Sequence, residues 1–194
     1  MQFSTIKLAV AALAVCSDAV LGAVVQRAIT PEQMVTNIQS LTSKSQALQA
    51  PAQSINIING PLIVVGLGPF PPIIAGFADI ITTTTTAIAT MQGSSPVPAG
   101  APSDAIFNAF KEFVRVHQVL LNILIGKAGL FQTVPLIGAP VAGVLRQLEA
   151  IVDTVALGII DLVQSRANDL QTEANKLSGT ITIAINSYDG LSLN

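Results

Sequence analysis

The sequence predicts an all-α protein, a secreted antiparallel bundle of about five to six helices with apolar segments broken by proline and glycine. Long stretches carry apolar residues at three- and four-residue steps, the period of one face of a helix. Hydrophobic residues make up 51% of the chain and charged residues 10%, against about 25% charged in an ordinary soluble domain. The only cysteine, Cys16, lies in the N-terminal leader. Packing rather than disulfides must therefore hold the mature domain together.

The first residues have the features of a secretory signal peptide. Lys7 precedes an apolar run at residues 8–15, and small residues follow at Ser17 and Ala19. Cleavage after residue 19 fits the small-x-small rule best, and a cut as late as residue 23 is also compatible with it. The run is too short for a membrane span, and no stop-transfer pattern follows it. We expect residues 1–19, or as far as residue 23 with the later cut, to be removed, and residues 24–194 to form a single helical domain. Its expected location is extracellular or at the cell wall.

The first helix of the mature domain is predicted to begin at residues 30–33. This stretch supplies a threonine cap, a proline in the first turn and the glutamine of a capping box. Apolar residues then follow a seven-residue rhythm as far as Leu48, with Ser45 as the polar exception, and Pro51 is expected to kink or interrupt the helix. A short second helical piece is expected over residues 52–58.

Residues 62–78 form the most apolar segment of the mature chain and contain no charge. Their number approaches that of a membrane span. Prolines and glycines interrupt the middle of the segment, however, and a kink exposed to lipid would leave backbone groups unpaired. We predict a broken, buried crossing, with membrane insertion as the alternative. A helix is expected from Pro72 to Met91, ended by Gly93.

The stretch of residues 103–127 predicts the central helix of the bundle. Ser103 marks its start, and Asp104 places a carboxylate in the first turn, where the positive end of a helix favours it. Polar residues occupy one side. The other side, which should face the core, comprises Ile106, Phe110, Phe113, His117, Leu120, Leu121 and Leu124.

A second long periodic segment begins at Val141, after several glycines and prolines between residues 126 and 140. Its helical pattern continues to Tyr188, although Ser178 and Gly179 could interrupt it. Residues 180–185 alternate well enough to be a strand in isolation. With helices on all sides and no second strand to pair with, a helix is the better prediction.

The sequence contains no recognisable catalytic constellation. His117 is the only histidine, and no G-x-S-x-G, H-E-x-x-H or phosphate-loop pattern is present. The carboxylate pairs Glu149/Asp153 and Asp169/Glu173 each lie one turn apart, but their polar neighbours indicate solvated faces rather than a cation site. The formal net charge of -2 provides no basic patch for nucleic acid. We therefore predict a protein that is not an enzyme and uses no cofactor, metal ion or nucleic acid.

An apolar chain of this kind hides a large core, encloses an apolar ligand or adheres to hydrophobic material. The ordinary interpretation of His117 is a core histidine bonded to a carbonyl or hydroxyl; the sharper one is that it meets the polar head of an apolar ligand. The candidate wall residues of a ligand cavity, chosen by helix face alone, are Phe77, Ile81, Phe110, Phe113, His117, Leu121, Leu148, Val152 and Val155.

Together with the leader and the cysteine-free helical pattern, three stretches resemble the fungal hydrophobic surface binding protein A and cell-wall galactomannoprotein family. They are the Ala-Val-Val-Gln-Arg27 start, the helix from Thr30 to Leu48 and the ending Ile181-x-x-Ala184-Ile185-x-x-Tyr188. The resemblance covers nearly the whole mature chain. It implies a helical bundle, in which some members bind fatty acids in a long apolar tunnel, and one described role is adsorption to hydrophobic surfaces to assist secreted hydrolases. The charge-free segments at residues 62–78 and 130–142 depart from the family's usual pattern.

These observations favour a secreted, non-enzymatic protein that binds a fatty acid or similar lipid in an apolar cavity between helices. Burial of each methylene contributes roughly 0.8 kcal/mol, so apolar contacts alone could hold a long tail. The alternative is a protein that adsorbs to the cell wall or to hydrophobic surfaces and recruits a secreted hydrolase. A membrane-inserting effector that uses residues 62–78 is the third hypothesis.

Overall fold

The structure is a computed structural model that describes residues 28–131 and 138–189, and in these residues the chain is helical without strands. The predicted signal peptide lies outside the described residues, as does part of the second charge-free segment. The all-α prediction is confirmed. The α-helices are α1 (Pro31–Ala47), α2 (Gln49–Ser54), α3 (Phe70–Met91), α4 (Ala101–Ala128), α5 (Gly138–Leu162) and α6 (Ala167–Asp189), and short 3-10 helices lie at η3 (Gly60–Val65), η4 (Gly129–Phe131) and η5 (Gln164–Arg166).

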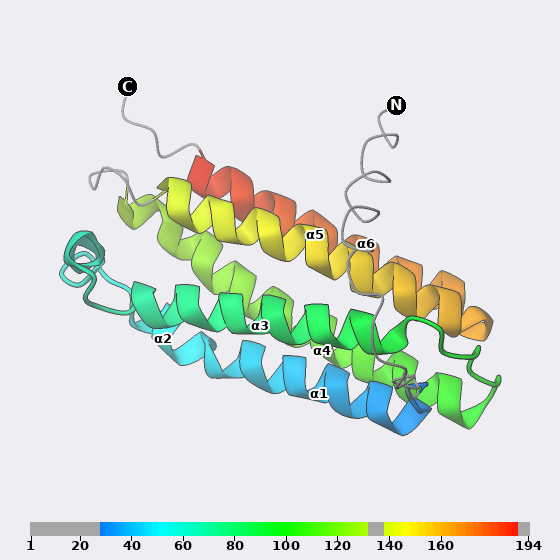
Figure 1. Cartoon of the computed structure of the whole chain (residues 1–194). Coiled ribbons are helices and arrows are strands. Elements are labelled where there is room, and N and C mark those ends of the chain that lie inside the picture. The colour runs from blue at the N-terminus through cyan, green and yellow to red at the C-terminus, as the bar shows by residue number, and fades with distance from the viewer. Residues whose placement is uncertain (1–27, 132–137, 190–194) are drawn as a thin grey trace, which may run out of the picture.

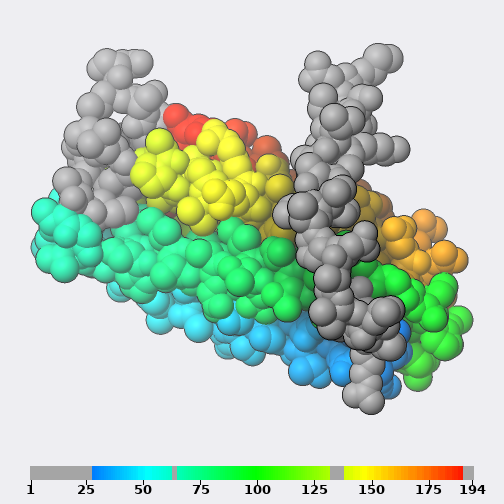
Figure 2. Space-filling model, viewed as in Figure 1, coloured from blue at the N-terminus to red at the C-terminus, as the bar shows by residue number. Residues whose placement is uncertain are grey.

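The five long helices form a ring around one shared interior. Going round the ring, the order is α1, α4, α6, α5 and α3, and α3 lies next to α1 again. Consecutive long helices run antiparallel, as predicted, while α1, α4 and α6 run in the same direction (Figure 1). In the space-filling view, α3 fills the surface between α5 and α1 (Figure 2). Apolar side chains from all five helices therefore meet in a common core.

The start of α1 confirms the predicted capping box. The Gln33 backbone N–H donates to the Thr30 hydroxyl at 3.2 Å, and the Thr30 backbone N–H donates to the Gln33 side-chain oxygen at 3.0 Å. The helix ends at Ala47, four residues before Pro51. Proline has no N–H to offer the carbonyl four residues earlier, and its ring clashes with that carbonyl. Pro51 thus explains why α1 gives way to the separate, short α2.

The second helical piece lies at Gln49–Ser54 and not at residues 52–58 as predicted. The Asn56 side-chain oxygen accepts hydrogen bonds from the backbone N–H groups of Ile58 and Asn59, at 2.9 and 3.0 Å. Asparagine side chains commonly replace helical hydrogen bonds in this way and turn the chain.

The break predicted within residues 62–78 is confirmed, but its burial is not. The 3-10 helix η3 is followed by a turn in which Gly66 and Gly68 adopt positive φ angles of 73° and 82°. Most of the described apolar side chains before α3 are exposed, among them Val65 at 67% and Leu67 at 60%. Only from Phe70 onward does the chain enter the core, because α3 provides an amphipathic face that the preceding turn lacks.

The first turns of α3 and α4 differ from the prediction by about two residues. Helix α3 begins at Phe70, and the prolines after it occupy the first turn, where a missing N–H costs nothing. Helix α4 begins at Ala101, after Gly100 with a φ of +98°. Ser103, the expected start, is buried and donates to the Pro98 carbonyl at 2.7 Å.

The C-terminal half forms two helices joined by the short η5 turn. Helix α5 begins at Gly138, three residues before the predicted Val141. Helix α6 continues without a break through Ser178 and Gly179 and through residues 180–185, so the helical prediction for that stretch is confirmed.

Two helical stretches, Phe70–Met91 and Ala101–Phe131, are long and apolar enough to cross a membrane by length and composition alone. Some of their apolar residues, such as Phe77 and Leu124, belong to the common core of the ring. Core helices of soluble proteins meet the same criterion, so this finding carries little weight for a membrane role.

Candidate functional site

Eight of the nine predicted wall residues lie in the interior of the ring with at most 5% of their surface exposed. The ninth, Ile81, is only partly buried and packs against the edge of the core. Ile81 directly follows Ile80, which is fully buried and lies on the inward face of α3. The ligand contacts themselves stay a prediction. The eight buried residues are Phe77, Phe110, Phe113, His117, Leu121, Leu148, Val152 and Val155.

His117 is fully buried and makes one hydrogen bond, to Ser45 of α1. Its Nδ1 lies 2.8 Å from the Ser45 hydroxyl oxygen, and that hydroxyl donates to the Leu41 carbonyl at 2.9 Å. A hydroxyl has a single hydrogen, so we assign the donor role in the Ser45–His117 bond to Nδ1. Nε2 is then an unprotonated acceptor, and it has no hydrogen-bond partner among the described residues.

The surroundings of His117 are otherwise aromatic and apolar. The Phe113 ring lies 5.3 Å from the imidazole, centroid to centroid, and the Phe77 ring from α3 lies 6.1 Å away, edge to face. Burial lowers the pKa of His117 to about 4. The imidazole is therefore neutral near pH 7 and presents a bare hydrogen-bond acceptor inside an apolar core.

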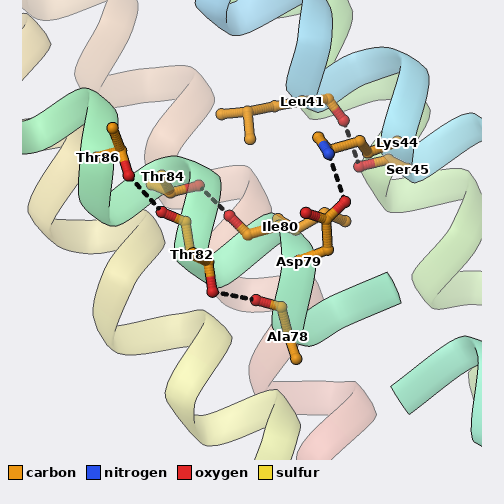
Figure 3. A network of polar contacts seen from close by, with 9 residues as sticks. All are labelled: Leu41, Lys44, Ser45, Ala78, Asp79, Ile80, Thr82, Thr84 and Thr86. Carbon is orange, nitrogen blue, oxygen red and sulfur yellow. Dashed lines mark hydrogen bonds and ion pairs between the residues drawn. The ribbon is translucent and has the colours of Figure 1, made fainter. Parts of the chain in front are cut away.

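The contact between α1 and α3 beside the Ser45–His117 pair is called the α1–α3 seam. It is defined by Lys44, Leu48, Gly76 and Asp79. Lys44 of α1 forms an ion pair with Asp79 of α3 next to Ser45, as Figure 3 shows. At Gly76, a Cβ atom would lie 2.3 Å from Leu48 Cδ2. The two helices approach so closely here because Gly76 has no side chain.

A small apolar cavity lies further along the same seam, between α1, α3 and α5. Its volume is about 20 Å³, whereas sites for drug-sized ligands have about 300–1,000 Å³. This cavity is therefore too small for a lipid chain, which could occupy it only if the surrounding helices moved apart. The lining residues are Ile29, Met34, Asn37, Ile38, Leu41, Ala87, Met91, Val155 and Ile159.

The choice of wall residues by face missed the contribution of α1 to this interior. Among the nine candidates only Val155 lines the cavity, while Met34, Ile38 and Leu41 of α1 line it and were not chosen. Their seven-residue rhythm was the available signal, because it identifies the face of α1 that points inward.

A second hollow, between α1 and α4, is an open surface groove of mixed polarity with a volume of about 660 Å³. Gln39, Thr42, Asn108 and Glu112 contribute polar groups to it. Such a lining offers an apolar chain little more than water does.

One end of the ring carries exposed apolar side chains, which we call the apolar end patch. It lies in the chain between α2 and α3, at the left end of the ring in Figure 1. The sequence predicted burial for its members from Leu62 onward, which belong to the segment 62–78. Its members, with their exposed fractions, are Ile57 (72%), Ile58 (82%), Leu62 (40%), Val65 (67%) and Leu67 (60%).

Three of the four carboxylates noted in the sequence, Glu149, Asp169 and Glu173, have partners of their own. Asp169 pairs with Arg166 at 3.1 Å, and Glu173 pairs with Lys176 at 2.8 Å. Glu149 accepts a hydrogen bond from the Thr182 hydroxyl at 3.0 Å. Within residues 28–131 and 138–189, no group of three or more His, Asp or Glu side chains is placed to hold a metal ion.

The ring of helices is the fold of known ligand-binding domains. AfMP4p, solved in complex with palmitic acid, has a TM-score of 0.72 and 14% identity, and the match covers 81% of this chain and 99% of that one. Ligand-binding domain 2 of the Penicillium marneffei MP1 protein, complexed with multiple arachidonic acids, has a TM-score of 0.66 and 14% identity over 82% of this chain and 94% of that one. Ligand-binding domain 1 of the same protein, complexed with arachidonic acids, has a TM-score of 0.62 and 13% identity over 80% and 98%. No family model and no curated sequence matches this chain.

Proposed function

We propose that this protein binds a fatty acid or similar long-chain lipid in the interior of its helical ring. The observation that carries the proposal is a core supplied by apolar faces of all five long helices, in a fold shared with domains solved in complex with palmitic and arachidonic acids. Each methylene that leaves water for such an interior contributes roughly 0.8 kcal/mol. The chain acts by burying its ligand and not by chemistry on it.

The α1–α3 seam is the part of the ring best suited to open. Its ion pair lies at the surface, with 31% of the Lys44 side chain and 56% of the Asp79 side chain exposed. Exposed ion pairs contribute only about 0–1 kcal/mol to stability. Parting α3 from α1 would extend the cavity beside Met34 and Met91 into a channel.

Secretion through the predicted leader and membership of the hydrophobic surface binding protein A family belong to the same proposal. Both rest on the sequence. The shared fold supports a relationship to fatty-acid-binding domains in general. Assignment to the one family named above is a more specific claim, and its support is the sequence resemblance.

Native mass spectrometry of the chain purified from its secretion medium tests the proposal. We expect a complex with palmitic acid, formed again after organic extraction and re-addition of the acid. Leu148→Trp, which fills the buried interior of α5, should abolish the complex, whereas Leu157→Trp, exposed at 57% on the same helix, should leave it intact. A folded wild-type protein that stays free of added fatty acid would contradict the proposal.

The apolar end patch supports a second candidate function, adsorption to hydrophobic solids or the cell wall. Five exposed apolar side chains on an uncharged stretch favour contact with a waxy surface. The double variant Ile58→Ser/Leu67→Ser should lose adsorption to a wax film while retaining palmitic acid. Unchanged adsorption by the folded variant would rule out the patch as the adhesive surface. Recruitment of a hydrolase is tested by adding the enzyme to the coated film.

A further inference from the structure

The buried His117 is poorly explained as a structural core residue. Its Nε2 is enclosed by protein and has no hydrogen-bond partner among the described residues. A buried polar atom without a partner is destabilising, and a phenylalanine would fill a similar space beside Phe77 and Phe113 without that penalty. The imidazole is nevertheless held in place by Ser45, which fixes its ring and its tautomer.

The position of Ser45 relates this polar site to the apolar cavity. Met34, Ile38, Leu41 and Ser45 follow one another on the inward face of α1, and the first three line the cavity. With a rise of about 1.5 Å per residue, Ser45 lies about 16 Å further along α1 than Met34. A lipid with its head at His117 and its tail in the cavity would therefore extend over a distance of this order.

We propose that His117 is the polar anchor of the lipid site, with Nε2 accepting a hydrogen bond from an O–H group at the polar end of the ligand. This inference rests on the proposed function, since it needs an interior that admits a lipid. The ligands it selects are long-chain molecules that keep an O–H donor, namely an alcohol or a protonated carboxylic acid. An ester of the same length has no such donor and would leave Nε2 unpaired.

The charges around the site favour a neutral head group. Lys44, which adjoins Ser45 on α1, is paired with Asp79 of α3 at the surface. On α4 itself, Arg115 and Glu112 pair with each other on the outer face. None of these groups offers a free cation to an ionised carboxylate in the interior, where an unpaired charge is costly. A hydrogen bond from a neutral O–H group carries no such cost.

The experiment compares hexadecanol, palmitic acid and methyl palmitate, three ligands with the same tail. Hexadecanol should bind the wild-type protein about tenfold or more tightly than methyl palmitate, the effect of one satisfied buried acceptor. His117→Phe should remove this preference and leave the affinity for methyl palmitate unchanged. His117→Gln, which keeps an acceptor oxygen, should restore part of it. If palmitic acid behaves like hexadecanol, the natural head is a protonated carboxyl; if it behaves like the ester, the natural head is a hydroxyl.

A second measurement needs no variant, because His117 is the only histidine of the chain. The ¹⁵N resonance of Nε2 in histidine-labelled protein should move toward the hydrogen-bonded range with hexadecanol and stay in place with methyl palmitate. If the lipids bind but the resonance moves equally with both, or if the preference survives in His117→Phe, the anchor is wrong and lipid binding stands. If none of the three lipids binds, the proposed function fails and the anchor fails with it.

Discussion

Two buried polar side chains, Tyr188 and His117, lie in the same core but differ in how completely they are hydrogen-bonded. Both are fully enclosed and both lie against phenylalanine rings. The Tyr188 hydroxyl donates to the Leu124 carbonyl at 2.9 Å, and its ring lies 6.5 Å from that of Phe131. Among the described residues, His117 pairs through one nitrogen only. In the region around Tyr188 the buried polar group has its hydrogen-bond partner, whereas in the region around His117 one buried nitrogen lacks a partner among the described residues.

The hydrogen bond from Tyr188 to the Leu124 carbonyl joins α6 to α4 at one end of the bundle. Phe131 packs edge-on against Phe70 of α3 at 4.9 Å, so three elements meet around Tyr188. Burial raises the pKa of the Tyr188 hydroxyl, which keeps it neutral and able to donate. The region around His117 lies instead beside the α1–α3 seam, where a surface ion pair joins the helices. Complete hydrogen bonding at Tyr188 indicates a structural role, and the incomplete hydrogen bonding at His117 is the observation on which the proposed lipid anchor rests.

The largest effect is expected at Tyr188. Tyr188→Ala should destabilise the protein by about 3–5 kcal/mol, the usual cost of removing a buried aromatic ring. Tyr188→Phe, which keeps the ring and loses only the bond to Leu124, should cost about 1 kcal/mol. Urea unfolding measures both. Equal losses in the two variants would mean that the hydroxyl, and not the packing, closes this end.

The second prediction concerns the pH dependence that the neutral, buried His117 imposes. Its pKa is about 4 in the folded protein and 6.5 when unperturbed. The unfolded chain therefore takes up a proton first as the pH falls, and the stability that is fully present above about pH 6.5 is lost on the way to pH 4, by about 3 kcal/mol. Urea unfolding at several pH values tests this.

His117→Phe is the matched control, because carboxylates elsewhere titrate in the same range. The variant should be at least as stable as wild type at neutral pH, since it loses an unpaired acceptor. It should also lack the histidine contribution between about pH 6.5 and 4. Parallel pH profiles for the two proteins would show that His117 is not enclosed in solution.

The smallest effect on stability is expected at the seam. Asp79→Asn removes the surface ion pair with Lys44 and should cost less than about 1 kcal/mol. If α1 and α3 part to admit a lipid, the same change should speed both uptake and release of a fluorescent fatty acid in stopped-flow experiments. Glu112→Gln, which breaks the exposed pair with Arg115 within α4, is the control and should leave these rates unchanged. Identical rates in wild type and Asp79→Asn would place the opening elsewhere in the ring.

Local signals predicted most of the helices because their causes lie within a few residues. The capping box at Thr30 and Gln33 and the helical run through residues 180–185 are both found as expected. The burial of Leu62, Val65 and Leu67 was predicted wrongly from the composition of their segment. Apolar residues there lack the helical period that would direct them to a common face, and their position at the end of the ring leaves part of them in contact with water.

The sequence by itself determined the helices and the side of each helix that is apolar, including the placement of His117 beside Phe113. Periodicity has this power because the angle between successive residues of a helix is constant. Only the tertiary structure decided that Ser45 would meet His117, that Met34 would line the cavity and that α3 would close the ring against α1. These pairings depend on the order of helices around the ring. That order follows from how five apolar faces pack together, which no single helix encodes.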